Sequence, residues 1–255
     1  MRLQLLSDLH LEAESFAPTP APDAELLVLA GDIDSNHHAL DTFAGWPVPV
    51  LYVAGNHEYD RRDFDQAQAA LRERCAAAGI VMLERERVVL SFGEQRVRFI
   101  GTTLWNDFEL FGESGRARSM RAARYFVEQI QRSTRGGAPF DVEALRQEGV
   151  LCRDWLRTEL QQPASAPGLW DRTVVITHSA PSMRSTDPRY PVDGATASFC
   201  NAYDSMIERC HLWLHGHLHC RHDYRVGSAR VVCNARGRAS RGESGDFRAR
   251  GVWSV

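Results

Sequence analysis

The chain has 255 residues, of which 44% are hydrophobic and 25% are charged, and its formal net charge is −3. This composition is ordinary for one folded α/β domain, which at this length buries about three quarters of the surface of the unfolded chain. The slightly negative charge excludes a bulk positive field that would attract nucleic acid or an acidic membrane surface. All 30 basic residues are arginine, which excludes mechanisms that use a lysine Schiff base or a lysine general base.

The start of the chain and its cysteines favour the cytoplasm. A strand pattern follows Met1 at once and leaves no room for a secretory signal peptide, and no apolar run approaches the ~20 residues of a membrane span. The six cysteines form no C-x-x-C pair, and we expect reduced thiols. The last four, with His211 and His222, suggest a zinc knuckle, but gaps of nine or twelve residues do not match the tight pairs of such sites.

Hydrophobic runs alternate with helical patterns along the chain, which predicts an α/β fold. Continuous apolar runs predict buried strands at 3–6, 26–31, 50–55, 174–177 and 212–214. Apolar residues at three- and four-residue steps predict a helix over 63–78, which Gly79 ends. A second long helix is expected at about 142–160, before Pro163, and an arginine-rich helix at 116–132.

Further short strands are expected at 88–92 and 97–100, joined by a Gly93-Glu94-Gln95 hairpin, and at 223–226, 230–233 and 251–255, while the strand that contains 212–214 is expected to span 211–214. The short connections imply antiparallel pairs beside the parallel ones, and therefore mixed sheets.

No repeat or interdomain linker interrupts the chain, so we predict a single domain over residues 1–255. The segment at about 102–140 is a candidate cap-like insertion over the site. The simpler interpretation of its Trp105 and Phe108 is ordinary packing. The polar, glycine-rich stretch 238–250 is expected to be a surface loop.

Polar side chains suited to binding metal follow five of the predicted strands. They are Asp8 and His10, Asp32, Asn56, His178, and His217 and His219. Together they offer three oxygen and four nitrogen donors, whereas one divalent ion in a catalytic site takes three or four protein ligands plus water. The set therefore suits two ions with a bridging carboxylate, an arrangement that can clamp the attacking and leaving oxygens of a displacement at phosphorus.

The order of these blocks resembles the calcineurin-like metallophosphoesterase family. The matching blocks are Asp8-Leu9-His10, Gly31-Asp32, Gly55-Asn56-His57-Glu58, His178 and Gly216-His217-Leu218-His219. The resemblance implies two mixed β-sheets packed face to face and flanked by helices, a four-layer sandwich with the site on loops at one edge. It also implies hydrolysis of a phosphomonoester or phosphodiester by a hydroxide that two metals activate.

The resemblance assigns roles to individual residues. Asp8, His10, Asp32 and His219 would hold one metal, and Asp32, Asn56, His178 and His217 the other. His57 would face the substrate and protonate the departing alkoxide, while Asn56 would also meet the phosphoryl oxygens. The donor set suits Mn, Fe, Zn or Co nearly equally.

Other polar residues receive more modest predictions. His37, His38, His211 and His222 are expected to be ordinary packing or surface residues. His215, Asp34 and Glu58 are expected to support or cap neighbouring groups rather than bind metal. Arg184 and Arg189 follow His178 closely and are candidates for pairing with a substrate phosphate, although surface arginines are common in this chain.

We favour a metal-dependent phosphoesterase that acts on a small or medium phosphorylated molecule. A protein Ser/Thr phosphatase is disfavoured, because Asp32 is not followed by the arginine typical of those enzymes and no His-Gly-Gly block occurs. A nuclease of the same superfamily is disfavoured by the negative charge. A non-catalytic binding scaffold of this fold is disfavoured because every position of the blocks is filled.

Overall fold

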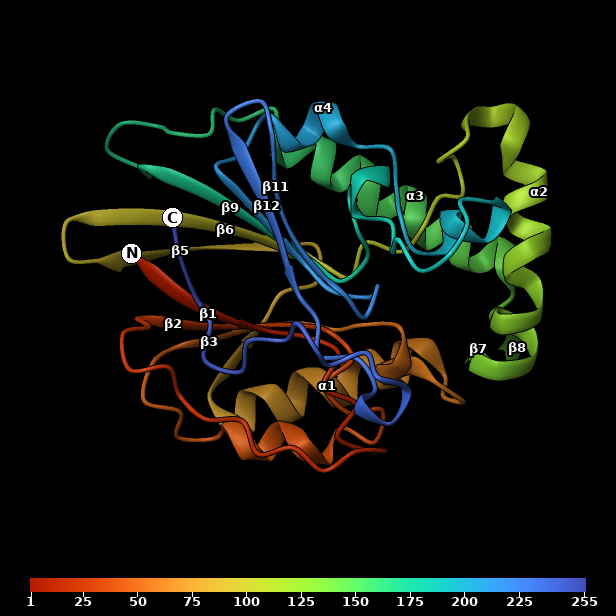
Figure 1. The fold of residues 1–255 in the computed structure, drawn as a ribbon, viewed down its shortest axis with the longest axis horizontal. Coiled ribbons are helices and arrows are strands. Elements are labelled where there is room, and N and C mark those ends of the chain that lie inside the picture. Colours follow the sequence, from red (N-terminus) through yellow and green to blue (C-terminus); the bar gives the residue numbers. More distant parts are fainter.

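The computed structural model describes residues 1–255 and contains two stacked mixed β-sheets. The first has the strand order β13-β1-β2-β3-β4, and the second β11-β12-β10-β9-β6-β5. Helix α1 covers the outer face of the first sheet, and α3 and α4 cover that of the second (Figure 1). The predicted four-layer α/β architecture is thus confirmed.

The strands of the first sheet are β1 (Arg2–Leu6), β2 (Leu26–Ala30), β3 (Val50–Val53), β4 (Ile80–Met82) and β13 (Val252–Ser254). Those of the second are β5 (Glu86–Phe92), β6 (Gln95–Thr102), β9 (Arg172–Thr177), β10 (Leu212–His215), β11 (Arg221–Val226) and β12 (Ala229–Asn234). The pairs β1–β13, β5–β6 and β11–β12 are antiparallel and the other pairs in these sheets are parallel, as the short connections predicted.

Both faces of the central strands are buried, which explains their continuous apolar sequence. In β2, Leu26, Val28 and Ala30 belong to the cluster between the two sheets, whereas Leu27 and Leu29 belong to the larger cluster that includes the helices. This alternation is the period of two that a strand imposes on its side chains.

The two long predicted helices are present with close to the predicted ends. Helix α1 spans Phe64–Ala78, with Asp63 as the N-cap that accepts a hydrogen bond from the backbone N–H of Gln66, and Gly79 closes it at a φ of 71°. Helix α3 spans Val142–Glu159, and the Asp141 side chain caps it through two backbone N–H groups. Helix α4 is a single turn, Asp204–Ile207. None of the helices is both long and apolar enough to span a bilayer.

The segment between β6 and α3 departs from the predicted α-helix at 116–132. Helix α2 spans Gly112–Tyr125, and a π-helical turn, η3, continues it over Phe126–Gln131 until Arg132 adopts a φ of 52°. The wider π turn accommodates an extra residue and re-aims the side chains that follow. A short hairpin, β7 (Thr134–Arg135) and β8 (Ala138–Pro139), completes the segment, and α2 stands across one end of the sandwich (Figure 1).

Five short 3-10 helices lie in the loops: η1 (His38–Phe43), η2 (His57–Tyr59), η4 (Met183–Ser185), η5 (Gly194–Ser198) and η6 (Ala239–Arg241). Helix η2 carries Glu58, which is buried and holds two strand-end loops together. Its carboxylate accepts backbone hydrogen bonds from Asp32 (3.1 Å), Ile33 (2.8 Å) and Gly55 (2.9 Å). The predicted supporting role of Glu58 therefore has a definite geometry: it locks the loop after β2 onto the loop after β3.

We expect Glu58→Ala to lower the free energy of unfolding by about 3 kcal/mol or more, because it leaves three buried N–H groups without an acceptor. Urea unfolding in the presence of a chelator would measure this without a contribution from bound metal. The control is Glu86→Ala, whose side chain is 45% exposed and pairs only with Arg72, with an expected change within about 0.5 kcal/mol. Equal, small effects of both substitutions would contradict the role of Glu58.

Candidate metal centre

The seven candidate ligands come from the carboxyl ends of five strands. Strands β1, β2 and β3 are neighbours in the first sheet, and β9 and β10 are neighbours in the second, so parallel pairing brings their ends to one edge of the sandwich. Two groups of ligand atoms gather there. The first contains Asp8, His10, Asp32 and His219, the second contains Asp32, His178 and His217, and the atoms of each group lie within 4.8 Å of one another.

The backbone at these residues is unusual. Five of the candidate ligands have a positive φ: Asp8 (53°), His10 (47°), Asp32 (52°), His217 (75°) and His219 (50°). Non-glycine residues rarely adopt this left-handed region, and such strain concentrates at functional sites where the surrounding structure enforces it. Each turn re-aims a side chain from the strand direction toward the common centre.

The glycines of the sequence blocks allow the close approach. A Cβ on Gly216 would lie 2.6 Å from the Asp8 Oδ2 atom, and a Cβ on Gly55 would collide with the side chain of Asp32. The requirement for Gly beside His217 and beside Asn56 is therefore steric, since the two carboxylates occupy the space that a side chain would need.

Each of the four histidines binds a protein acceptor with one ring nitrogen and presents the other to the centre. His178 Nδ1 donates to the Ala30 carbonyl (2.9 Å), and His217 Nε2 donates to the Ser198 carbonyl (3.0 Å). His219 Nδ1 lies 2.7 Å from Glu243 Oε2, and His10 Nδ1 lies 3.0 Å from Glu12 Oε1. Metal-binding imidazoles are held in this way, because the outer hydrogen bond fixes both the ring and its tautomer.

One inner oxygen atom lacks the partner that a metal-free site would need, and two inner nitrogens have only each other. His10 Nε2 and His219 Nε2 face each other at 3.0 Å, although the outer carboxylates place the ring protons of both on Nδ1. The Asp32 Oδ2 atom is buried without a hydrogen-bond partner, 3.4 Å from His178 Nε2 and 3.9 Å from His10 Nε2. Buried polar atoms of this kind require compensation, and a cation among them provides it.

Asp32 and the imidazoles around it shift one another's pKa values, and a cation bound at the centre would displace the proton that Asp32 favours on His178. Burial opposes the cationic form of His178, but the carboxylate of Asp32 outweighs burial and raises the pKa of His178 to about 10. Conversely, burial favours protonation of Asp32, yet His178 and His57 together hold its pKa well below the usual range. Burial lowers the pKa of His217 to about 3, which leaves that imidazole neutral, as a metal ligand must be.

His57 lies beside the ligand cluster. Its Nδ1 is 2.6 Å from Asp60 Oδ2, and its Nε2 is 4.0 Å from Asp32 Oδ2. Although burial lowers it, the pKa of His57 is raised to about 9 by Asp32 and Asp60. Asn56 is oriented by its Oδ1, 3.2 Å from His178 Nε2, and its Nδ2 is buried without a partner.

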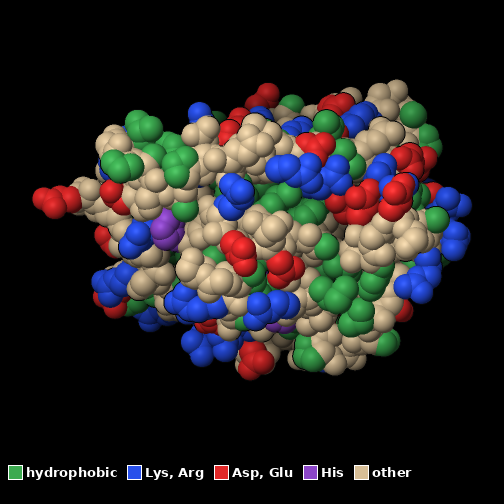
Figure 2. Space-filling view, turned by 90° about the horizontal axis from the view of Figure 1, so that it is seen from above, with side chains coloured by type: hydrophobic (Ala, Val, Ile, Leu, Met, Phe, Trp, Pro, Cys, Tyr) green, Lys and Arg blue, Asp and Glu red, His purple; other side chains and the backbone are tan.

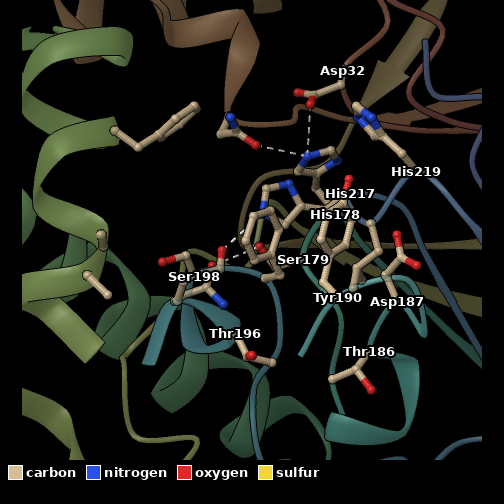
Figure 3. Close-up of a pocket in the computed structure, with 18 of the residues that line it drawn as sticks. Asp32, His178, Ser179, Thr186, Asp187, Tyr190, Thr196, Ser198, His217 and His219 are labelled. Carbon is tan, nitrogen blue, oxygen red and sulfur yellow. Dashed lines mark hydrogen bonds and ion pairs between the residues drawn. The ribbon is translucent and has the colours of Figure 1, made fainter. Parts of the chain in front are cut away.

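A pocket of about 750 Å³ opens beside the cluster. Asp32, His178, His217 and His219 lie on one side of it, and the helical segment α2–η3 forms another side (Figure 3). The pocket is therefore continuous with the candidate metal centre.

The two candidate arginines differ in position. Arg189 lines the pocket, but its guanidinium already forms a two-point contact with Asp187 and donates to the carbonyl of His219 (3.1 Å). Arg184 is not among the lining residues, because its guanidinium stacks over the Tyr224 ring at 4.7 Å.

The other supporting residues lie as follows. Asp34 caps the turn at 36–39 through backbone N–H groups of Asn36 and Ala39. His215 is buried, and its Nε2 accepts from the Ser185 hydroxyl at 2.9 Å.

Sequence reasoning missed three carboxylates that orient the histidines: Glu12, Asp60 and Glu243. Glu12 and Asp60 lie two and three residues from the histidines that they hold, so short spacing could have identified them. Glu243 is 24 residues from His219, in the stretch 238–250 for which the sequence predicts a surface loop. No sequence pattern indicates its contact with His219.

Comparisons with known structures agree with the fold. The solved structure of Phosphopantetheinyl Hydrolase (PptH) from Mycobacterium tuberculosis is similar with a TM-score of 0.74 and 17% identity, over 99% of this chain and 95% of that one. A structure described as a putative 5'-nucleotidase from Staphylococcus aureus is similar with a TM-score of 0.51 and 15% identity, over 92% of this chain but only 49% of that one. At these identities the likeness shows the fold alone. No curated protein sequence matches the chain.

A family model for calcineurin-like phosphoesterases matches residues 1–221. The matched range contains all seven candidate ligands and His57. The chain therefore belongs to the calcineurin-like phosphoesterase family, a family of hydrolases.

Proposed function

We propose that this protein is a binuclear metal-dependent phosphoesterase that hydrolyses a phosphomonoester or phosphodiester. The observation that carries the proposal is the gathering of the candidate ligands around one buried carboxylate, that of Asp32. Four imidazoles, each held from outside by a protein acceptor, gather with Asp8 around Asp32, whose Oδ2 atom is buried without a hydrogen-bond partner and lies 3.4 Å from His178 Nε2 and 3.9 Å from His10 Nε2. Such an arrangement suits cations better than any internal hydrogen-bond network.

In this proposal Asp32 is shared between two metal positions. Asp8, His10 and His219 complete the first, while Asn56, His178 and His217 complete the second. Two divalent ions, drawn from Mn, Fe, Zn or Co, would supply Lewis-acid polarisation of the phosphoryl group and a water made acidic enough to attack at neutral pH.

The remaining chemistry belongs to His57 and Asn56. His57 directs its Nε2 toward the cluster, 4.0 Å from Asp32 Oδ2, while Asp60 holds its Nδ1, so it is placed to give a proton to the departing alkoxide. The free Nδ2 of Asn56 is placed to donate to a phosphoryl oxygen, while its Oδ1 faces the second metal position. Arg189 would contact the substrate if a phosphate displaced Asp187 from its guanidinium. Arg184 stacks on Tyr224 and does not line the pocket, so we do not propose it as a substrate contact.

We favour a small or medium phosphorylated substrate over nucleic acid, because the net charge of the chain is −3. On the face that carries α3 and α4, arginine and acidic side chains are interspersed rather than gathered into a basic strip (Figure 2). A nuclease of the same superfamily and a non-catalytic scaffold remain the alternatives. The cytoplasm is the proposed location, since all six cysteines are free.

A substrate screen of the Mn-loaded protein separates these functions. It should contain phosphomonoesters, cyclic nucleotides, dinucleotides and single-stranded DNA, together with a phosphopantetheinyl ester and 5'-nucleotides because similar structures are named for them. Hydrolysis of a small ester that a chelator abolishes supports the proposal. Salt-sensitive DNA cleavage without small-ester hydrolysis would favour a nuclease, and no hydrolysis with metal bound would favour a scaffold.

We expect Asp32→Asn to lower the metal content at both positions, because the substitution removes the shared anionic ligand. Elemental analysis of protein reconstituted with Mn should fall from two equivalents to well below one. Asp34→Asn is the matched control, since Asp34 only caps a local turn and should keep full metal content. Unchanged two-metal stoichiometry in Asp32→Asn would refute the bridging role.

We expect His57→Ala to keep both metals but to lose activity mainly on esters with poor leaving groups, because those need a proton on the departing oxygen. The loss in kcat should be about 10²- to 10⁴-fold for an alkyl ester and much smaller for a nitrophenyl ester. Equal losses on the two esters would show that His57 does not act as the general acid.

We expect Asp60→Asn to reproduce part of the His57→Ala defect, since Asp60 orients the imidazole through its Nδ1 at 2.6 Å. The kcat for the alkyl ester should fall about tenfold or more, with KM and metal content nearly unchanged. A rise in KM alone would assign Asp60 to substrate binding instead, and Asp60→Glu should restore part of the rate if orientation is its role.

A further inference from the structure

The pocket is much larger than a phosphoryl group requires. Its volume is about 750 Å³, within the range of sites that enclose whole small-molecule ligands, and 13 of its 33 lining residues are hydrophobic. The polar ligand cluster occupies one side (Figure 3), so the remaining space is available to the part of the substrate attached to phosphorus.

The π-helical turn η3 supplies one wall of this space. Phe126, Val127, Ile130 and Gln131 all line the pocket, as expected when the wider turn places residues i, i+4 and i+5 on one side. Phe126 is 40% exposed and Ile130 is 42% exposed. Neither side chain is needed to fill the core, so an apolar surface faces the cavity.

The segment 190–199 supplies further apolar wall. Tyr190, Val192 and Phe199 line the pocket and are 64%, 53% and 41% exposed. Of the eleven exposed large hydrophobic side chains in the protein, five (these three with Phe126 and Ile130) line this one pocket. Single exposed hydrophobics are ordinary on a protein surface, whereas a group of them around a cavity marks a binding site.

The apolar walls contact His57 and the candidate metal ligand His217. The Phe126 ring meets the His57 ring edge-to-face with centroids 6.0 Å apart, and the Phe199 ring lies 5.0 Å from that of His217. His57 is the group proposed to protonate the departing oxygen, so Phe126 lies on the side to which the alcohol leaves.

We propose that the pocket selects phosphoesters whose leaving alcohol is apolar, an aryl or alkyl group seated against Phe126 and Ile130 of η3 and against Val192 and Phe199. This inference rests on the proposed phosphoesterase function and specifies its substrate class. The opposing feature is a pair of arginines, Arg238 and Arg241, which also line the pocket and would suit an anionic leaving group.

A series of aryl esters with matched leaving-group acidity tests the proposal. The metal-loaded protein would be assayed with the phosphates of phenol, 4-propylphenol, 4-butylphenol and 4-(carboxymethyl)phenol, or with their methyl diesters if it cleaves only diesters. We expect kcat/KM to rise about fourfold for each methylene buried, and so at least about tenfold from phenyl to butylphenyl. A flat series, or a preference for the carboxymethyl ester, would overturn the inference.

Two variants assign the effect to the wall. Phe126→Ala and Ile130→Ala should each reduce the ratio of kcat/KM for butylphenyl over phenyl ester by about threefold or more. Tyr125→Ala is the matched control: Tyr125 precedes Phe126 and is 70% exposed, but it does not line the pocket, and its ratio should equal that of the unaltered protein. Equal ratios in all three variants would contradict the assignment to η3.

A binding measurement separates this inference from the proposed function. Calorimetry would compare 4-butylphenylphosphonate with phenylphosphonate on the metal-loaded protein, and neither compound is hydrolysed. Tighter binding of the butyl compound supports the apolar wall even if no ester is cleaved, in which case only the catalytic proposal fails. Equal affinities, or no binding of either compound, would overturn the inference that the pocket selects apolar leaving groups. Hydrolysis of an ester, if observed, would still support the proposed phosphoesterase function.

Discussion

The buried carboxylate of Asp32 is the constraint around which the rest of this structure is arranged. Its Oδ2 atom accepts no hydrogen bond, although it lies within 4.0 Å of the ring nitrogens of His10, His57 and His178. Burial of an uncompensated carboxylate is expensive, so the site is stable only when positive charge surrounds this atom. Protonated imidazoles can provide that charge, and so can the metal ions that we propose, because the outer acceptors of His10 and His178 turn the Nε2 atoms of both rings toward Asp32. The same atom therefore links the two groups of ligands and explains why they share one residue.

The ends of the strands position the residues around Asp32. Parallel pairing within each sheet and face-to-face stacking of the sheets bring five carboxyl ends to one edge, and left-handed turns then re-aim the side chains. Two further links hold the edge together. Glu58 locks the loop after β2 to the loop after β3, and Asn234 at the end of β12 donates to the Leu5 carbonyl at 2.7 Å, which ties the second sheet to β1. The candidate ligands are thus carried by the loops that follow paired strands, whereas the apolar wall of η3 belongs to a segment outside both sheets.

Much of this arrangement follows from the sequence, for identifiable physical reasons. Continuous apolar runs marked the strands because both faces of each sheet are covered, and capping residues such as Asp63 and Gly79 marked the ends of α1. The ordered blocks gave the family and the candidate ligands, since each block is short and local. Two features had no local pattern. Glu243 reaches His219 only through tertiary folding, and the π turn at 126–131 cannot be told from an ordinary helix by periodicity.

The most direct test of the central claim is a crystal structure of the Mn-loaded protein with anomalous diffraction data collected at the metal edge. The account predicts two anomalous peaks per chain, about 3.5–4 Å apart, with the Asp32 carboxylate between them and bonded to both. One peak alone, or two peaks of which only one is bonded to Asp32, would contradict it.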